Sequence, residues 1–468
     1  MVGDGVLEDP MRKKLSSFRA FKLSSFAFAL APIGCFVGSR TDLFPEGELD
    51  GAMPMDGGAQ KDTGIDTGWD AHKYAWKATH CERDIEAGLP KTFSAPGGSD
   101  GDSGIFGETW AMPQAIPIGG PVIKRPLLVP ISFVEDDVST IDEIEDFCAS
   151  VLCTPYWQAV AKDYGVGMGS SAPPVRLTEK AWTQIDDTGI AKWLRGKLDA
   201  KDPAFETPTS DTLYAIYVPY STTVTLQGGT SCQRFLAYHN STKLGNGQRV
   251  AYAVMPQCAG IEQLTAASSH EFIEAATDPY PNQVPAYRQT DEGHLPWSLF
   301  AGGEVADLCE FNDDANFKPA TFPWTVQRSW SNSEAFLGLD PCAPASATPP
   351  YIAAIPDQPD VVHLFGNGRA MKGIKLSPGD TRMIALRLHA PVSMTPAWTV
   401  SVKDIAAFQG GPTRLQFSLN AGTGKDGDVL QLKISKLSNN TGSGLEMFLV
   451  FSTGGGKTTM YWATAGAN

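Results

Sequence analysis

The sequence predicts an α/β (α+β) domain over residues 119–345 and an all-β sandwich over residues 350–468. In the first region, short apolar runs alternate with segments of helical spacing, which is typical of strands packed against helices. In the second region, short strand-like runs are separated by turns rich in Gly and Asn, which favours two packed antiparallel sheets. Between them, Pro349-Pro350 ends a linker-like stretch.

The elements of the first domain follow from these patterns. In chain order they are a buried strand over 126–133, helices over 141–162 and 190–198, and buried strands over 212–219 and 250–255. The next helix is expected from about Gln263 to Ala276. It ends there because Pro279 disfavours a helical conformation of the residue before it.

The second domain is predicted from four strand-like runs, over 415–419, 429–434, 447–451 and 459–462. The last run carries Tyr461 and Trp462, adjacent aromatic residues that could present a flat platform to a ligand. Aromatic residues in strands are more often half-buried packing residues, so we expect that role for them.

The N-terminal residues 1–35 are typical of an export signal. A basic stretch from Met11 to Lys22 precedes an apolar stretch over 23–33 that is too short to span a membrane. Cleavage is expected after Ala31, or lipid attachment at Cys35, which follows a lipobox-like Pro32-Ile33-Gly34. The sequence therefore predicts a secreted protein, or a periplasmic or outer-membrane lipoprotein of a bacterium, that meets a membrane only through an anchor at Cys35.

Composition narrows the classes of partner. Residues 36–118 are rich in Gly, Asp and Pro, as in a linker or a pro-segment. The formal net charge of −15 argues against a nucleic-acid partner, which requires a basic surface.

Eight cysteines in an exported chain predict disulfides, and the absence of a C-x-x-C pair argues against a zinc ribbon.

The segment His270-Glu271-Phe272-Ile273-Glu274 carries the chemistry that we expect of the chain. Residues four apart on a helix share one face, so His270 and Glu274 could bind one metal ion. Glu271 occupies the position of the general base in an H-E-x-x-H metalloprotease. The pattern is also compatible with a charged helix face that binds nothing.

A third ligand is expected from the acidic segment that begins thirty residues after Glu274. We assign Glu304 as the ligand and Asp307 as the acceptor that orients His270; the reverse assignment is the alternative. Asp278 and His239 are further candidates. His239 could bind the metal or stabilise an oxyanion, but its place in a loop favours a surface histidine with no role. The acidic residues over 310–314 are expected to form a solvated loop.

This set of ligands favours zinc, because an imidazole suits zinc, whereas the carboxylates would also tolerate calcium. The expected reaction is hydrolysis, in which the metal lowers the pKa of a water molecule and Glu271 accepts its proton. Two carboxylate ligands would neutralise the zinc charge, so we expect either modest activity or a different metal.

The motifs resemble a family of secreted proteins. The runs from Ser269 to Pro279 and from Gly303 to Cys309 are similar to those of the phosphate-induced (Exordium-like) proteins and their bacterial relatives, and Tyr252 to Cys258 gives further support. The resemblance covers residues 119–345 and implies a zincin-like metalloprotein domain. It leaves residues 36–118 and 350–468 unassigned.

Two functions follow from these expectations. The first is a zinc-dependent peptidase that acts on a protein or peptide substrate outside the cytoplasm. The second is a non-catalytic, metal-stabilised binding protein that contacts a component of the cell envelope.

Overall fold

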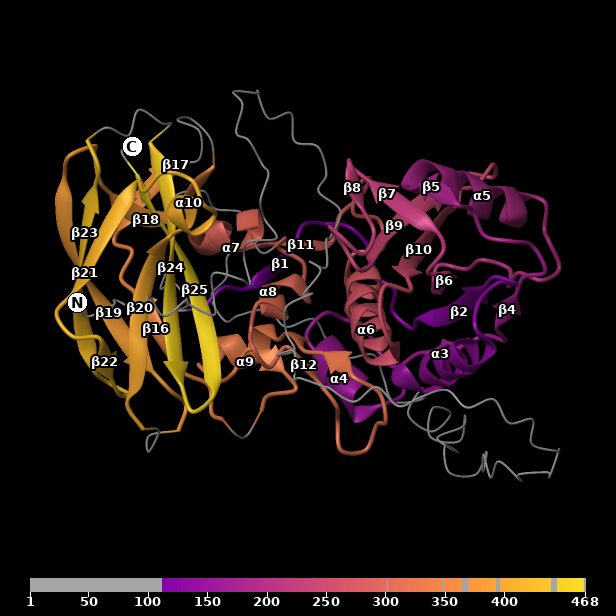
Figure 1. Cartoon of the computed structure of the whole chain (residues 1–468), viewed down its shortest axis with the longest axis horizontal. Coiled ribbons are helices and arrows are strands. Elements are labelled where there is room, and N and C mark those ends of the chain that lie inside the picture. The colour runs from indigo at the N-terminus through magenta and orange to yellow at the C-terminus, as the bar shows by residue number, and fades with distance from the viewer. Residues whose placement is uncertain are drawn as a thin grey trace, which may run out of the picture.

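The computed structural model describes residues 112–300, 302–346, 349–363, 369–392, 396–438 and 444–466. Within these ranges the chain is rich in β-sheet and has few helices (Figure 1). The expected signal peptide with Ala31 and Cys35, and most of the expected linker or pro-segment, lie outside the described residues.

A six-stranded sheet organises the first half of the described chain. Its order is β3-β2-β6-β10-β9, and β4 also pairs with β2. The strands are β2 (Leu127–Ser132), β3 (Ser170–Ser171), β4 (Val175–Arg176), β6 (Thr212–Val218), β9 (Tyr238–Lys243) and β10 (Arg249–Pro256). All pairs are parallel except β9 with β10, so β9 is an antiparallel edge strand.

Helices and a small sheet cover the two faces of this sheet. On one face, α3 (Val138–Val151), α4 (Pro155–Ala161) and α6 (Ile261–Thr277) pack against side chains such as Leu213 and Ala215. On the other, α5 (Asp187–Asp199) packs against the alternate side chains, such as Tyr214 and Ile216. The small sheet has the order β5-β7-β8, from Gln184–Asp186, Thr223–Leu226 and Gly229–Thr230. Successive side chains of the central strands thus point to opposite faces, and helices lie on both faces, as expected for an α/β arrangement.

The helix expected over 141–162 is wrong as one element, because it consists of two helices. α3 ends at Val151, and Thr154 begins α4 by accepting a hydrogen bond from the backbone N–H of Trp157. Pro155 is tolerated at the first helical position of α4 but would interrupt the hydrogen bonds of a continuous helix.

Short elements after α6 form the middle of the molecule in Figure 1. They are β11 (Tyr287–Thr290), the 3-10 helix η2 (Glu292–His294), α7 (Leu295–Phe300), α8 (Asp307–Glu310), β12 (Asn316–Phe317), β13 (Val326–Gln327), β14 (Ser329–Trp330), α9 (Asn332–Phe336) and β15 (Cys342–Ala343). β1 (Ala115–Pro117) pairs with β11, so residues before 119 also contribute to this body.

The second half of the described chain is a β-sandwich. One sheet has the order β16-β19-β23-β21 and the other β17-β18-β25-β24-β20-β22. The strands are β16 (Ala353–Pro356), β17 (Asp360–His363), β18 (Ala370–Lys375), β19 (Thr381–His389), β20 (Trp398–Asp404), β21 (Leu415–Leu419), β22 (Thr423–Gly424), β23 (Val429–Lys436), β24 (Leu445–Gly454) and β25 (Lys457–Gly466), with the short helix α10 (Ile405–Phe408). The four predicted strands coincide with β21, β23, β24 and β25.

The sandwich and the first half share a continuous hydrophobic core. Tyr461 and Trp462 are only 4% and 5% exposed. Tyr461 packs edge-on against Trp297 of α7, and Trp462 packs against Phe311. These rings therefore join the two halves and are not an exposed platform.

Buried charges also cross this junction. The Lys457 ammonium on β25 lies 2.7 Å from Oδ2 of Asp340 and 3.1 Å from Oδ2 of Asp314. The expectation of a solvated loop over 310–314 is thus wrong. Glu310 is buried, and Asp314 pairs with a lysine that is inaccessible to solvent.

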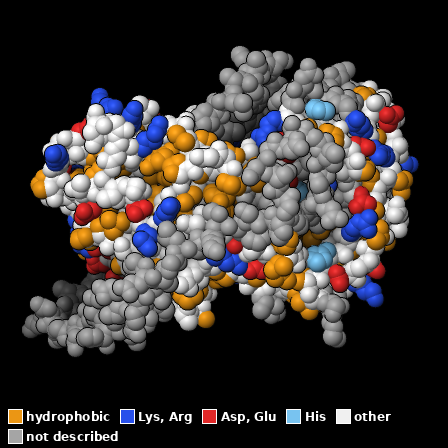
Figure 2. All heavy atoms as spheres, turned by 180° about the vertical axis from the view of Figure 1, so that it is seen from behind, with side chains coloured by type: hydrophobic (Ala, Val, Ile, Leu, Met, Phe, Trp, Pro, Cys, Tyr) orange, Lys and Arg blue, Asp and Glu red, His pale blue; other side chains and the backbone are white. Residues whose placement is uncertain are grey.

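Two disulfides lie within the described ranges, Cys232–Cys258 and Cys309–Cys342, and Cys148 is a buried free thiol. No helix in the described part of the chain is long and apolar enough to cross a membrane. On the face shown in Figure 2, the described acidic, basic and apolar side chains are interspersed.

Candidate metal centre

Helix α6 carries polar side chains into the interior of the protein. Every residue from Leu264 to Thr277 is buried, including His270, Glu271 and Glu274, which are inaccessible to solvent. An ordinary helix of this kind would bury apolar residues only, because burying an uncompensated charge costs several kcal/mol. These side chains therefore require partners from other elements.

One group of potential ligands combines α6 with the start of α8. Nε2 of His270 lies 3.1 Å from Oε2 of Glu274 and 3.5 Å from Oδ1 of Asp307. Each residue offers one ligand atom, and the three atoms lie within 4.8 Å of one another. Both ring nitrogens of His270 are buried and make no hydrogen bond to the described residues. A cation that took the place of the Nε2 proton would therefore meet one nitrogen and two carboxylate oxygens.

Backbone N–H groups hold Glu274 in place. Its Oε1 accepts hydrogen bonds from the backbone N–H groups of Ala306, at 3.1 Å, and Asp307, at 3.0 Å. Gln327 of β13 supports the same turn, since its side chain donates to the Ala306 carbonyl and its backbone N–H donates to Oγ of Ser269. Oε2 of Glu274 is thereby directed toward His270.

The turn before α8 depends on two glycines. Gly302 and Gly303 have φ angles of +96° and +84°, which residues with a Cβ rarely adopt. A Cβ on Gly302 would lie 2.0 Å from Oδ2 of Asp307. The absence of a side chain therefore allows the Asp307 carboxylate to occupy its position.

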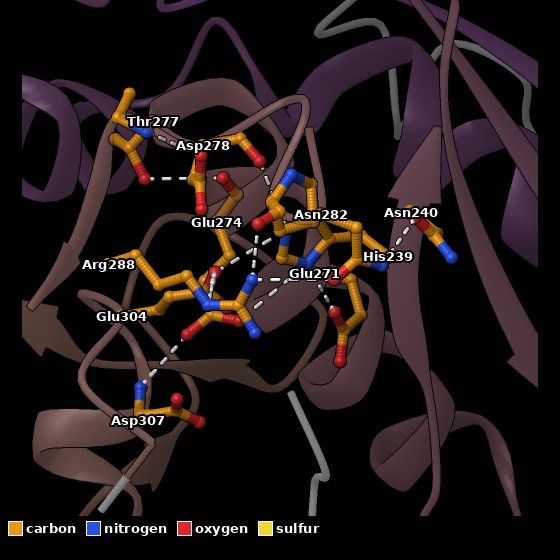
Figure 3. Close-up of polar contacts among 12 residues, drawn as sticks. His239, Asn240, Glu271, Glu274, Thr277, Asp278, Asn282, Arg288, Glu304 and Asp307 are labelled. Atoms are coloured by element: carbon orange, nitrogen blue, oxygen red, sulfur yellow. Dashed lines mark hydrogen bonds and ion pairs between the residues drawn. The ribbon is translucent and has the colours of Figure 1, made fainter. Parts of the chain in front are cut away.

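His239 approaches the same space from the edge strand β9. Its Nδ1 lies 3.2 Å from Oε2 of Glu271 and 3.9 Å from Oε2 of Glu274. Its Nε2 lies 3.2 Å from the backbone carbonyl oxygen of Asp278, the residue that caps α6. Figure 3 shows His239, Glu271 and Glu274 turned toward one another.

Glu304 lies beside this cluster and next to a guanidinium group. Its Oε1 is 3.8 Å from Nε of Arg288 on β11 and 3.9 Å from Nε2 of His239. Arg288 is held by a hydrogen bond to the carbonyl of Pro281. Asp278 accepts a hydrogen bond from the backbone N–H of Ala286 through Oδ1, whereas its buried Oδ2 makes none to the described residues.

The pKa shifts in the cluster have a common direction. Burial raises the pKa values of Glu271 and Glu304, and the neighbouring Glu274 charge raises both further. Burial and Glu274 raise the pKa of Asp307 to about 7. Burial by itself lowers the pKa values of His239 and His270, but the surrounding carboxylates outweigh it and raise both. Without a metal, the cluster therefore retains protons.

The six residues expected at the site, His239, His270, Glu271, Glu274, Glu304 and Asp307, lie in this one buried cluster. The structure brings Asp307, expected to orient His270, into the group that contains His270 and Glu274, and it brings Glu304 next to Arg288. Arg288, Gln327 and Gly302 were not expected from the sequence. Gly302 and Gly303 form a glycine pair immediately before the acidic segment, and this pair is the signal that could have identified the turn.

The likenesses of this chain to known proteins are weak and concern solved structures. No protein-family model matches the chain, and no curated protein matches it. Domains 4 and 5 of the S-layer protein SbsC are 8% identical over 25% of this chain and 53% of theirs, with a TM-score of 0.16. A FixG-related protein from Vibrio parahaemolyticus is 12% identical over 26% of this chain and 99% of that protein, with a TM-score of 0.18.

The titin M3 domain is a further weak likeness, 15% identical over 20% of this chain and 88% of that domain, with a TM-score of 0.15. The chain covers about half of the S-layer fragment, 53%. Scores at this level carry no argument about the activity of this protein.

Proposed function

We propose that the chain is an exported, zinc-dependent hydrolase of the zincin type that cleaves peptide bonds, with zinc bound by His270, Glu274 and Asp307. The observation that supports this proposal most is the convergence of their three ligand atoms within 4.8 Å in a buried site. The resemblance of the runs around His270 and Asp307 to Exordium-like proteins and their zincin-like relatives agrees with it.

The donor set fits a zinc ion. Imidazole nitrogen and carboxylate oxygen are ordinary zinc ligands, and three protein ligands leave a fourth position for water or substrate. Calcium prefers six to eight oxygen ligands, more than this group of one nitrogen and two carboxylates provides. Zinc is therefore the favoured ion, and calcium the alternative.

The proposed chemistry is hydrolysis with a carboxylate base. When bound, zinc supplies Lewis acidity, which makes a water more acidic and polarises a carbonyl group. Glu271 accepts the proton of the attacking water and later delivers it to the leaving amine. His239 holds Oε2 of Glu271 at 3.2 Å, so Oε1 is the oxygen that meets the water. The raised pKa of Glu271, caused by burial, suits a group that both accepts and donates a proton.

Export is part of the proposal. The basic and apolar stretches over residues 11–33 support secretion, or lipid anchoring at Cys35, in a bacterium. The two disulfides of the described chain suit an oxidising compartment. The substrate would then be a protein or peptide outside the cytoplasm.

A second candidate function is a metal-stabilised binding protein of the cell envelope without catalysis. The depth of the centre favours it, because His270, Glu271 and Glu274 are inaccessible and Asp307 is 2% exposed. A peptide bond could reach such a centre only along a path that admits substrate to the interior.

The deciding experiment measures bound metal and casein cleavage for the wild type and Glu271→Gln. Glu262→Gln, on an exposed position of the same helix, is the matched control. We expect zinc in all three proteins, and cleavage in the wild type and the control but not in Glu271→Gln. Bound zinc with no cleavage in any protein would favour the binding function. Cleavage that survives Glu271→Gln would remove Glu271 as the base.

A further inference from the structure

A second group of ligand atoms adjoins the first. His239, Glu271 and Glu274 each offer one ligand atom, and these atoms lie within 4.8 Å of one another. Glu274 belongs to both groups, so its carboxylate could be shared by two ions. All three residues are at least 98% buried.

The hydrogen bond from Nε2 of His239 orients its ring so that Nδ1 faces the two glutamates. Its Nε2 lies 3.2 Å from the carbonyl oxygen of Asp278, and a carbonyl oxygen can only accept a hydrogen bond. Nδ1 lies 3.2 Å from Oε2 of Glu271, which is also an acceptor, so both ring nitrogens can donate when no metal is bound. A divalent ion would take the place of the Nδ1 proton, while the Nε2 proton would keep the ring oriented. Metal-binding histidines are commonly oriented through their other nitrogen in this way.

When fully deprotonated, the cluster carries more negative charge than one divalent ion can balance. Five buried carboxylates lie in it, those of Glu271, Glu274, Asp278, Glu304 and Asp307, and the guanidinium of Arg288 is the permanent positive charge beside them. When all are ionised, four negative charges remain, which is the charge of two divalent cations. Oε1 of Glu271 is also buried without a hydrogen bond to the described residues.

We propose that the centre binds a second divalent transition-metal ion through Nδ1 of His239, Glu271 and Glu274, and that this ion inhibits hydrolysis. The inhibitory effect rests on the proposed function, in which Glu271 accepts a proton from water. A carboxylate that donates its lone pairs to an ion cannot accept that proton. Occupancy of the second site therefore stops hydrolysis, and the concentration of free zinc sets that occupancy.

Zinc stoichiometry tests the site itself, independently of activity. The full chain is stripped with a chelator and titrated with Zn²⁺, with calorimetry and elemental analysis as readouts. We expect two zinc ions per chain in the wild type, the second bound more weakly, and one in His239→Ala. His389→Ala, in strand β19 of the sandwich, is the control and should retain two. Circular dichroism checks that His239→Ala folds. If it does not, His239→Gln and Glu271→Gln, which preserve side-chain volume, replace it, and each should bind one zinc ion.

The remaining outcomes separate this inference from the proposed function. One zinc ion in both the wild type and His239→Ala would overturn the second site and leave the first intact. Two ions in His239→Ala would overturn the role of His239, and none in the wild type would overturn both proposals. In the active wild type, zinc beyond the first equivalent should reduce cleavage to the level of Glu271→Gln. Unchanged cleavage with two ions bound would overturn the inhibitory role.

Discussion

At the scale of single residues, the acidic side chains of the cluster differ in the positively charged or polar group that lies nearest to each. Asp307 faces an imidazole, at 3.5 Å, whereas Glu304 faces a guanidinium, at 3.8 Å. A metal ion can replace the proton of an imidazole nitrogen but cannot displace a permanently charged guanidinium. In the proposed site, this difference favours Asp307 as the ligand and leaves Glu304 beside Arg288.

Asp307→Asn should therefore weaken zinc binding more than Glu304→Gln. Loss of an outer-shell partner costs roughly 10- to 100-fold in metal affinity, and we expect Glu304→Gln to fall in that range and Asp307→Asn to exceed it. Competition with a chromophoric chelator measures both affinities. The opposite order would restore Glu304 as the ligand, the assignment made from the sequence.

At this scale the sequence identified the residue types but not their pairing. The four-residue spacing on a helix predicts that His270 and Glu274 share a face, because the helical repeat is local. Whether Glu304 or Asp307 meets His270 depends on the turn that precedes α8, which spacing does not reveal. The neighbour of Glu304, Arg288, lies on β11 and belongs to none of the quoted motifs.

At the scale of elements, the glycine turn positions α8 against α6. Gly302 combines a φ of +96° with a position directly beside the Asp307 carboxylate. The backbone N–H groups that fix Glu274 follow within five residues. In the proposed zinc site, helix α6 would supply two ligands, and this turn would supply the third and restrain one of the first two.

Gly302→Ala should consequently damage the metal centre without touching a ligand. The unfavourable φ costs about 1–3 kcal/mol, and the new Cβ displaces the Asp307 carboxylate. We expect a lower melting temperature and weaker zinc binding. Gly422→Ala is the control, since a Cβ there meets no heavy atom within 4 Å. Zinc affinity equal to that of the control would mean that the turn does not position Asp307.

Elements were easier to predict than their boundaries and partners. The strands at β2, β6, β10, β21, β23, β24 and β25 and the helix α6 follow from local patterns of apolar residues. The split at Thr154-Pro155 was missed because the apolar spacing continues across it. The strands from β16 to β20 were not identified individually.

At the scale of the whole molecule, the sandwich and the first half behave as one packed body in the described ranges. Their shared core includes aromatic pairs across the junction and a lysine inaccessible to solvent. His294 of η2 adds a polar link, because it hydrogen-bonds Asp291 through Nδ1 and the Tyr461 hydroxyl through Nε2. The sandwich thereby holds the segment that follows β11, the strand of Arg288.

Removing Lys457 should destabilise the whole molecule. Breaking a buried ion pair on one side typically costs about 3–5 kcal/mol, because the other charge stays buried. We expect a loss of this size in the free energy of unfolding for Lys457→Met, and a smaller loss when Asp340→Asn is added. Urea unfolding measures both, with the exposed Lys425→Met as the control. A loss no larger than that of the control would show that the junction contributes little.

Zinc should stabilise the protein more at high pH than at low pH. Every resolved shift among the two histidines and three carboxyl groups of the cluster is upward. The folded, metal-free chain therefore binds more protons than the unfolded chain, so its stability decreases as pH rises. The loss begins near the ordinary carboxyl pKa of about 4 and continues through the Asp307 pKa of about 7.

Bound zinc would reverse this trend because it binds deprotonated ligands, and it would add about 2.7 kcal/mol at one hundred times its Kd. We expect the difference in melting temperature between zinc-loaded and chelator-treated protein to increase from about pH 5.5 to about pH 8. Thermal unfolding measures it across that range. A difference that stays constant or shrinks would contradict the linkage between the buried carboxyl groups and metal binding.

The sequence by itself determined what local rules control: the α/β pattern followed by β-strands, the face shared by His270 and Glu274, and the chemical types of the site residues. Only the tertiary structure decided which distant groups meet. The packing of β9 beside α6 brings His239 to Glu271, and the turn at Gly302 brings Asp307 to His270. These contacts join residues more than thirty positions apart. They depend on the packing of whole elements, which the spacing of residues within one element does not encode.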